Sequence, residues 1–331
     1  MAPLAGRKVL VTGADGFIGS HLTERLIAEG ADVRAFCFYN IRGSGGWLDE
    51  LAPEQAGQVE VMFGDIRDEG VVREACTDIE VVFHLAALIS IPYSYAAPSS
   101  FVETNVRGTL NVLEAARAAG CARIINTSTS EVYGTPDTVP IREDHPLKAQ
   151  SPYSATKIAA DKLCEAYALS FGTPVIVLRP FNTYGPRQSA RAVLMTILSQ
   201  LLAGKRRVSL GNLTPRRDLT YVADTVDGFV RAAAAHVEPG EVIQLGTGQA
   251  CSVREIFDVA CRVVGVEAEV EVDAARIRPE RSEVQVLLSD PSRAADRLGW
   301  AATTSLEVGI EKAATWLKDW MPAYRADAYV T

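Results

Sequence analysis

Short apolar runs alternate with longer amphipathic stretches through the first half of the chain. Each run has four to six residues and is typical of a strand buried on both faces. The runs lie at residues 8–12, 33–38, 59–63, 81–85, 123–127 and 175–178. Amphipathic patterns between them predict helices, notably over residues 102–119 and 153–171. This alternation predicts an α/β fold, a doubly wound parallel (Rossmann) sheet with helices on both faces.

The pattern loosens after Pro180, where polar and turn residues become frequent. Residues 242–245 form one more strand-like run, which we expect to return to the main sheet. Helices predicted over 253–264 and 306–320 belong to a smaller C-terminal α/β lobe. We therefore expect two units. Residues 1–180, together with 219–250, form a dinucleotide-binding domain, and residues 181–218 and 251–331 form a substrate-binding lobe.

Composition narrows the classes of protein to consider. With 331 residues, 48% of them hydrophobic, the chain can bury a large core, and no apolar run approaches the length of a membrane span. The net charge of −8 disfavours nucleic acid as a partner. The six cysteines include no Cys-x-x-Cys pair, and the four histidines show no metal-binding spacing. We expect a cytoplasmic protein with reduced thiols, no metal and no leader peptide.

A glycine-rich segment follows the first predicted strand and opens a helix. It contains Gly13, Gly16 and Gly19, with Phe17 and Ile18 before the last glycine. Glycines in this context allow a tight turn, and the helix N-terminus offers N–H donors to a pyrophosphate. The segment predicts binding of a dinucleotide.

The choice between NAD and NADP stays open from the residues alone. An acidic residue normally ends the second strand and binds the adenosine ribose, but residues 34–40 contain no carboxylate. Arg42 follows, and it is either a partner for a 2′-phosphate or a solvated charge. Asp65, directly after the third strand, is a candidate for the adenine end of the site, although aspartate is also common in such turns.

Candidate acid–base chemistry lies in two further segments. Tyr153 and Lys157 are four residues apart, so they share one face of the predicted helix, which Ser151 and Pro152 are suited to begin. We expect the ammonium group to stabilise a phenolate and so to lower the pKa of the tyrosine. Upstream, Thr129 offers a hydroxyl for a substrate alcohol. Glu131 adds a carboxylate that alcohol oxidation alone does not need.

Six motifs occur in order along most of the chain, and they are Thr12-Gly13-Ala14-Asp15-Gly16-Phe17-Ile18-Gly19, Gly64-Asp65-Ile66-Arg67-Asp68, His84-Leu85-Ala86-Ala87, Asn105-Val106-x-Gly108-Thr109, Tyr153-x-x-x-Lys157 and Arg179-Pro180-Phe181-Asn182-x-Tyr184-Gly185-Pro186. In these motifs the chain resembles the extended short-chain dehydrogenases/reductases of the nucleotide-sugar epimerase and dehydratase family. The resemblance implies a tightly held nicotinamide cofactor, NAD with NADP not excluded, and a nucleotide-diphosphate sugar as substrate. It also implies a homodimer that pairs the helices near 102–119 and 153–171.

The resemblance also implies roles for individual residues. In addition to the glycine segment, Tyr153 and Lys157, the cofactor is expected to contact Asp65, Ile66, Leu85, Ala86, Ala87 and Pro180. The substrate is expected to contact Asn182, Arg217 and Arg278, the two arginines at its diphosphate. His84 is expected to be a satisfied structural histidine instead of an acid or base.

Thr129-Ser130-Glu131 is similar to the triplet of the 4,6-dehydratases, especially the GDP-mannose type, whereas the 4-epimerases lack the carboxylate. Residues 87–95 and 188–193 resemble dehydratases of legionaminic-acid-type pathways, which act on nucleotide-linked N-acetylglucosamine. The resemblance implies a lyase in which Tyr153 takes the C4 hydroxyl proton and Glu131 the C5 proton. Protonation of the departing water then falls to Glu131 or passes through Ser130. Deoxythymidine-sugar dehydratases carry Asp at the position of Ser130, which puts direct proton donation by that residue in doubt.

Other activities remain compatible with the sequence. UDP-glucuronate decarboxylases share the Thr-Ser-Glu triplet, so decarboxylation is the main alternative, together with 4-epimerisation. A more remote alternative is a non-catalytic regulator that senses NAD(P). Such a protein is expected to lose the tyrosine or the lysine, and this chain keeps both.

Overall fold

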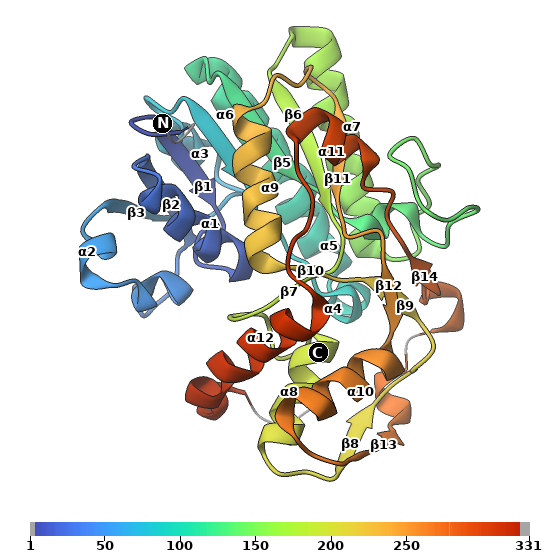
Figure 1. Ribbon diagram of the computed structural model, residues 1–331. Helices are drawn as coiled ribbons and strands as arrows, with labels where there is room; N and C mark the ends of the chain where they lie inside the picture. Colours follow the sequence, from blue (N-terminus) through green and yellow to red (C-terminus); the bar gives the residue numbers. More distant parts are fainter. Residues whose placement is uncertain (1–3, 278, 325–331) are drawn as a thin grey trace.

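The computed structural model describes residues 4–277 and 279–324 and is built on a seven-stranded sheet (Figure 1). All neighbouring strands of this sheet run parallel, in the order β11-β6-β5-β4-β1-β2-β3. Their bounds are β1 Lys8–Thr12, β2 Asp32–Phe38, β3 Val59–Gly64, β4 Val81–His84, β5 Arg123–Thr127, β6 Val175–Pro180 and β11 Val242–Leu245. The sheet confirms the doubly wound fold predicted from the sequence, including the return of the last strand.

Helices cover both faces of the sheet because residues along each strand point alternately to opposite sides. Val9 and Val11 of β1 join the core cluster that contains α1 and α9, whereas Leu10 joins the one that contains α3, α6 and α7. The bounds of these helices are α1 Phe17–Ala28, α3 Glu69–Ala75, α6 Gly108–Ala119, α7 Pro152–Phe171 and α9 Val222–Ala234. Hydrophobic residues on both faces of one strand are what a central parallel strand requires.

The predicted helix over 102–119 begins differently from an ordinary α-helix. Residues Val102–Arg107 form a π-helical segment, η2, which leads directly into α6. The buried Asn105 lies within η2. Its side-chain amide donates hydrogen bonds to Leu88 O at 2.9 Å and to Thr156 Oγ1 at 3.0 Å. The π-helical segment thus holds the chain after β4 next to α7.

The C-terminal lobe carries three short sheets and lies below the main sheet in Figure 1. Its larger elements are α8 Val193–Leu202, β8 Arg207–Leu210, β9 Arg216–Asp218, β12 Ala250–Ser252, α10 Val253–Val264, β13 Glu269–Val272, β14 Val286–Leu287 and α12 Leu306–Trp320. The strands pair as β13-β8 and β12-β9-β14, and β7 pairs with β10 between the two units. Residues 292–298, which the sequence assigned to this lobe, form α11, and α11 packs against α9 and β11 of the main sheet.

Short elements complete the chain, and they are η1 Gly46–Glu50, α2 Pro53–Ala56, α4 Ile91–Ala96, α5 Pro98–Phe101, η3 Ser130–Tyr133, β7 Thr183–Tyr184, β10 Thr220–Tyr221, η4 Ala274–Arg276, η5 Glu280–Ser282, α11 Ser292–Leu298 and η6 Met321–Ala323. In the described part of the chain, no helix has both the length and the apolar character that a membrane span needs.

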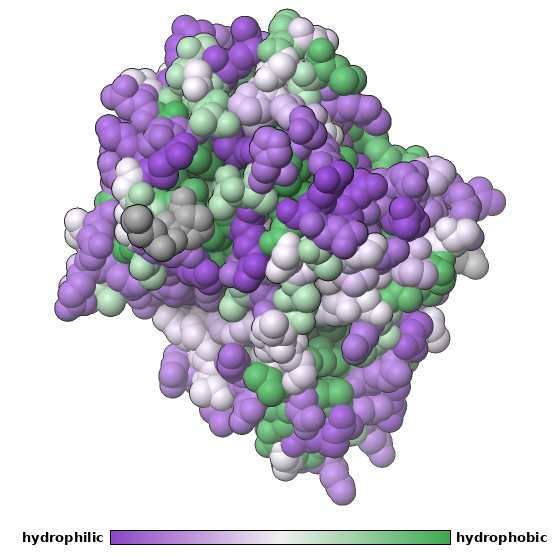
Figure 2. Space-filling view, turned by 45° about the horizontal axis from the view of Figure 1, so that its top comes forward, coloured by the Kyte–Doolittle hydropathy of each residue, from purple (hydrophilic) through white to green (hydrophobic). Residues whose placement is uncertain are grey.

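On the face drawn in Figure 2, hydrophilic residues predominate and hydrophobic ones form scattered patches. Such scattered apolar groups are ordinary for a protein surface.

The strand order reverses between β1 and β4, and this reversal marks where a ligand-binding crevice is expected. The chain leaves β1 toward β2 and β3 on one side, then returns to build β4, β5 and β6 on the other. Helices that follow β1 and β4 therefore diverge at the carboxyl ends of these strands. In open α/β sheets ligands bind at this point.

Candidate active site

The start of α7 presents Tyr153 to the crevice. Ser151 caps the helix by accepting a hydrogen bond from Ser154 N at 3.1 Å, and Pro152 is the first helical residue, both as predicted. Tyr153 is buried, and its ring meets the edge of Phe101 with the centroids 6.2 Å apart. Helix cap and aromatic contact together fix the phenol in place.

Thr129 and Glu131 lie beside this phenol. They flank the start of η3, where Thr129 Oγ1 accepts a hydrogen bond from Glu131 N at 3.2 Å. Burial raises the pKa of Tyr153 above its ordinary range, a hydrogen bond with Thr129 lowers it, and the charge of Glu131 raises it. The fold therefore brings the predicted hydroxyl, carboxylate and tyrosine together, and Ser130 is buried between Thr129 and Glu131.

Lys157 is buried one turn further along α7, but its main partner differs from the expected one. Its Nζ donates a hydrogen bond to Thr127 O, at the end of β5, at 2.6 Å. Burial lowers the pKa of Lys157, and the charge of Asp161 counteracts this. The sequence led us to expect a lowered pKa for Tyr153, but the pKa is raised because burial outweighs every favourable contact of the phenol.

Asp161 is a buried residue of this region that the sequence reasoning did not single out. Its Oδ2 accepts hydrogen bonds from Ser128 Oγ at 2.8 Å and from Arg179 Nε at 3.1 Å, and Arg179 Nη2 lies 3.0 Å away as an ion pair. Burial raises the pKa of Asp161, while Arg179 and Lys157 lower it. Its spacing was a usable signal, because Asp161 follows Lys157 by four residues and so lies on the same helical face as Tyr153 and Lys157.

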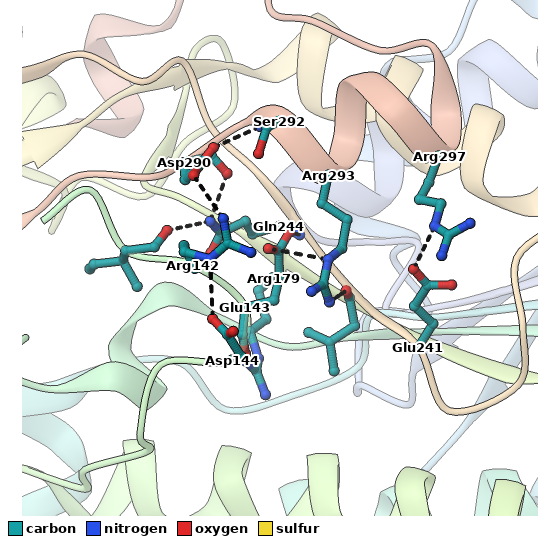
Figure 3. Close-up of polar contacts among 12 residues, drawn as sticks. Arg142, Glu143, Asp144, Arg179, Glu241, Gln244, Asp290, Ser292, Arg293 and Arg297 are labelled. Carbon is teal, nitrogen blue, oxygen red and sulfur yellow. Dashed lines mark hydrogen bonds and ion pairs between the residues drawn. The ribbon is translucent and has the colours of Figure 1, made fainter. Parts of the chain in front are cut away.

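Arg179, the partner of Asp161, belongs to a polar network that includes Glu143 and Gln244, which lie close to Arg179 in Figure 3. Arg179 Nη1 donates to Tyr133 Oη at 2.9 Å, and Tyr133 Oη donates to Gln244 Oε1 at 3.1 Å. The Gln244 backbone N–H in turn donates to Glu143 Oε1 at 3.1 Å. Because Tyr133 ends η3, this network anchors the short helix that carries Glu131.

The glycine segment forms a tight cradle with no room for a side chain at Gly13 or Gly19. Gly13 has a φ of +70°, and a Cβ there would lie 2.8 Å from Ala86 N. A Cβ on Gly19 would lie 2.1 Å from Gly13 O. The N-terminus of α1 begins at Phe17 after Gly16 and has no side-chain cap. These features fit a pyrophosphate bound by backbone N–H groups.

His84 ties the glycine segment to the next strand. Its ring nitrogens contact Thr12 Oγ1 at 2.8 Å and Thr109 Oγ1 at 3.1 Å, and Thr12 Oγ1 also accepts from Leu85 N and Ala86 N. Burial, with a smaller effect of the Lys157 charge, lowers the pKa of His84 to about 3. The histidine is a neutral structural group, as predicted.

The other predicted cofactor residues line the same edge of the sheet. Asp65 pairs with Arg67, which lowers the pKa of the Asp65 carboxyl. Ile66 is buried against Gly108. The remaining candidates are half-buried at strand ends or at the start of α1, and they are Phe17, Ile18, Leu85, Ala86, Ala87 and Pro180.

The predicted substrate residues lie on the side of the C-terminal lobe. Asn182 Oδ1, just after β6, is buried and accepts no hydrogen bond from any described residue. Arg217 of β9 is buried and its Nη2 pairs with Glu283 Oε1 at 3.0 Å. Arg278 lies outside the described residues. A buried acceptor without a donor and a buried guanidinium are the groups that a polar, anionic substrate can engage.

Comparisons with known proteins agree with this geometry. The family model for GDP-mannose 4,6 dehydratase matches residues 10–313. A UDP-glucose 4-epimerase from Mycolicibacterium smegmatis is 36% identical over 312 residues, covering 92% of this chain and 96% of the relative. A dTDP-glucose 4,6-dehydratase from Actinoplanes sp. is 32% identical over 316 residues, covering 94% and 98%.

Among solved structures, the dTDP-glucose 4,6-dehydratase DesIV from Streptomyces venezuelae, with NAD bound, superposes with a TM-score of 0.86. It is 29% identical, and the match covers 94% of this chain and 97% of that one. The relatives thus share the fold along nearly the whole chain but differ in the reaction that they catalyse.

Proposed function

The chain belongs to the GDP-mannose 4,6-dehydratase family of nucleotide-sugar epimerases and dehydratases, and on that premise we propose that it is an NAD-dependent nucleotide-sugar 4,6-dehydratase. Its product is the 4-keto-6-deoxy sugar, and its substrate is a nucleotide-linked hexose, N-acetylglucosamine in particular. The observation that carries this proposal is the Glu131 carboxylate, which lies close enough to Tyr153 for its charge to raise the pKa of the phenol. Oxidation at C4 alone needs no such carboxylate.

The first step uses Tyr153 and Thr129. Thr129 holds the C4 hydroxyl of the sugar, and Tyr153 takes the proton of that hydroxyl. NAD, held by the glycine cradle and the start of α1, would supply the hydride exchange between C4 and C6. Lys157, fixed by Thr127 O, supplies a donor for the cofactor ribose.

The second step uses Glu131. A ketone at C4 makes the C5 proton acidic, and Glu131 takes that proton as general base. The C6 hydroxyl then departs as water, protonated by Glu131 or through Ser130. The proton removed at C5 and the hydroxyl lost at C6 leave together as one molecule of water. Hydride return at C6 is completed by a proton delivered to C5, which balances the proton that Tyr153 took from the C4 hydroxyl.

The remaining site residues bind the cofactor and the substrate. The glycine cradle and the start of α1 hold the cofactor pyrophosphate, and Arg217, Arg278 and Asn182 hold the diphosphate sugar.

A homodimer through η2, α6 and α7 is also proposed, because Val102, Leu110, Leu169 and Phe171 leave apolar surface exposed there. A cytoplasmic location remains a prediction.

Two alternative reactions share the first step. The 36% identity with a UDP-glucose 4-epimerase supports epimerisation, in which the C4 ketone is reduced from its other face. UDP-glucuronate decarboxylation is the other alternative, because a C4 ketone also activates the C5 carboxylate for loss of carbon dioxide.

The product separates these reactions. Purified protein is incubated with UDP-, GDP- and dTDP-linked glucose, N-acetylglucosamine and mannose, and with UDP-glucuronate, and the sugar products are analysed by mass. Loss of one water, with deuterium transferred from C4 to C6, is the expected result. Loss of carbon dioxide from the glucuronate, or an unchanged mass with inverted C4, would replace the dehydratase assignment.

A further inference from the structure

The second strand of the sheet ends without the carboxylate that usually recognises the adenosine ribose, yet a carboxylate is present at that place. Asp15, from the glycine segment, lies at the carboxyl end of β2, where Phe38 N donates to its Oδ2 over a long 3.4 Å. The glycine segment follows β2 closely at this point, because Gly13 N also donates to Phe36 O at 2.9 Å. We propose that Asp15 replaces the missing acid, binds the 2′-hydroxyl of the adenosine ribose and selects NAD over NADP.

Asp15 is held in this position by the segment that follows β2. Its backbone oxygen accepts a hydrogen bond from Trp47 N at 3.2 Å. Gly46, with a φ of +60°, approaches so closely that a Cβ there would lie 2.6 Å from Asp15 O. Asp15 is half-buried, so its carboxylate is partly shielded from water yet still open to a ligand.

Negative charge dominates this corner of the crevice. Burial, together with the charges of Asp15 and Asp49, raises the pKa of Cys37 to about 12. The Asp49 carboxylate is engaged by Ser44 Oγ at 2.6 Å and Gly45 N at 2.9 Å. Asp15 is therefore the carboxylate placed to receive a ribose hydroxyl, and a 2′-phosphate there meets two negative charges.

Arg42 is the residue that could favour NADP, as a partner for its 2′-phosphate. Its positive charge does not offset the negative charges of Asp15 and Asp49. Its side chain is exposed, and the turn that carries it is closed by Asn40, whose Oδ1 accepts from Arg42 N at 3.1 Å and Ser44 N at 3.2 Å. An exposed guanidinium is screened by water and salt, whereas the half-buried Asp15 carboxylate is screened less.

A binding measurement tests this inference without any sugar substrate. It rests on the nicotinamide cofactor proposed above. The wild type, Asp15→Asn and the control Asp49→Asn are equilibrated with equimolar NAD and NADP at fixed pH and ionic strength. The bound nucleotide is then released by denaturation and identified by mass spectrometry. Asp15→Asn keeps the shape of the side chain and removes its charge.

We expect NAD to dominate in the wild type and in Asp49→Asn. In Asp15→Asn the ratio of bound NADP to NAD should rise by about tenfold or more. An unchanged ratio in Asp15→Asn, or a wild type that takes up both nucleotides equally, overturns the role of Asp15 but leaves the cofactor proposal intact. Release of neither nucleotide overturns both.

Discussion

The support of the glycine segment, on the cofactor side of the crevice, and the substrate side differ in how their buried polar groups are satisfied. Beneath the glycine segment, His84 contacts both Thr12 Oγ1 and Thr109 Oγ1, and Thr12 Oγ1 also accepts a hydrogen bond from Leu85 N. On the substrate side, Asn182 Oδ1 and Thr220 Oγ1 are buried without a partner among the described residues. A satisfied shell is rigid before any ligand arrives, whereas unsatisfied groups gain their partners from the ligand.

In the proposed function, the C4 oxidation uses Tyr153 and Lys157 and is shared by the alternative epimerisation and decarboxylation. The reaction that follows depends on the groups around the sugar, such as Glu131. We therefore expect changes on the cofactor side to affect stability, and changes on the substrate side to affect turnover.

The largest expected effect comes from Asp161, in the buried shell behind α7. Asp161→Ala leaves the guanidinium of Arg179 buried without its counter-charge, and we expect it to lower the free energy of unfolding by about 3–5 kcal/mol. Denaturant titration measures this loss. The matched control is Arg73→Ala, which removes an exposed pair with Glu69 and should change stability by less than about 1 kcal/mol. Equal effects of the two variants would contradict the idea that the buried Asp161–Arg179 pair holds α7 on the sheet.

The next largest effect concerns pH on the cofactor side. The pKa of His84 is about 3 in the folded protein, against an ordinary value of 6.5, so the unfolded chain binds a proton first as the pH falls. Stability is fully present above 6.5 and declines below it, by about 2 kcal/mol between pH 6.5 and about 5.

Thermal or denaturant unfolding across this pH range, compared with His84→Asn, measures the contribution. The variant should lose this part of the pH dependence, although it is less stable at neutral pH. The exposed His236 provides the control, since His236→Asn should keep the wild-type dependence. If the stability of His84→Asn depended on pH as strongly as that of the wild type, groups other than His84 would be responsible for the dependence.

A smaller effect is expected on the substrate side. Arg217→Lys keeps the charge beside Glu283 but loses the planar fork that we propose for binding the diphosphate, so KM should rise by about tenfold. Arg216→Lys, one residue away and on the exposed face of β9, is the control and should leave KM within about twofold of the wild type. NAD affinity should remain unchanged in both. A loss of NAD binding in Arg217→Lys would show that the two sides of the crevice are not separate.

The sequence was most informative where a local pattern decides the structure. Three features depend only on neighbours in sequence, and the structure agrees with each. They are the apolar strand runs, the glycine segment and the start of the helix at Ser151 and Pro152. The short strands of the C-terminal lobe, such as Val286–Leu287, contain too few residues to show a period.

The buried network behind α7 was not predicted for a different reason. Arg179 and Asp161 are 18 residues apart and lie on a strand and a helix, so only the packing of α7 on the sheet brings them together. The raised pKa of Tyr153 likewise depends on burial, which no spacing reveals. Asp15 was visible within the glycine segment, but its position at the end of β2 required the structure.

The role of Glu131 is tested most directly by Glu131→Gln, which keeps the size of the side chain and removes the base. The variant, loaded with NAD, is mixed with the nucleotide sugar that the wild type dehydrates. The near-ultraviolet absorbance of reduced nicotinamide and the sugar mass are then followed together. We predict that reduced nicotinamide accumulates while the sugar loses no water, because C4 oxidation proceeds and C5 proton removal stalls. Full conversion to the dehydrated product by Glu131→Gln would contradict the account.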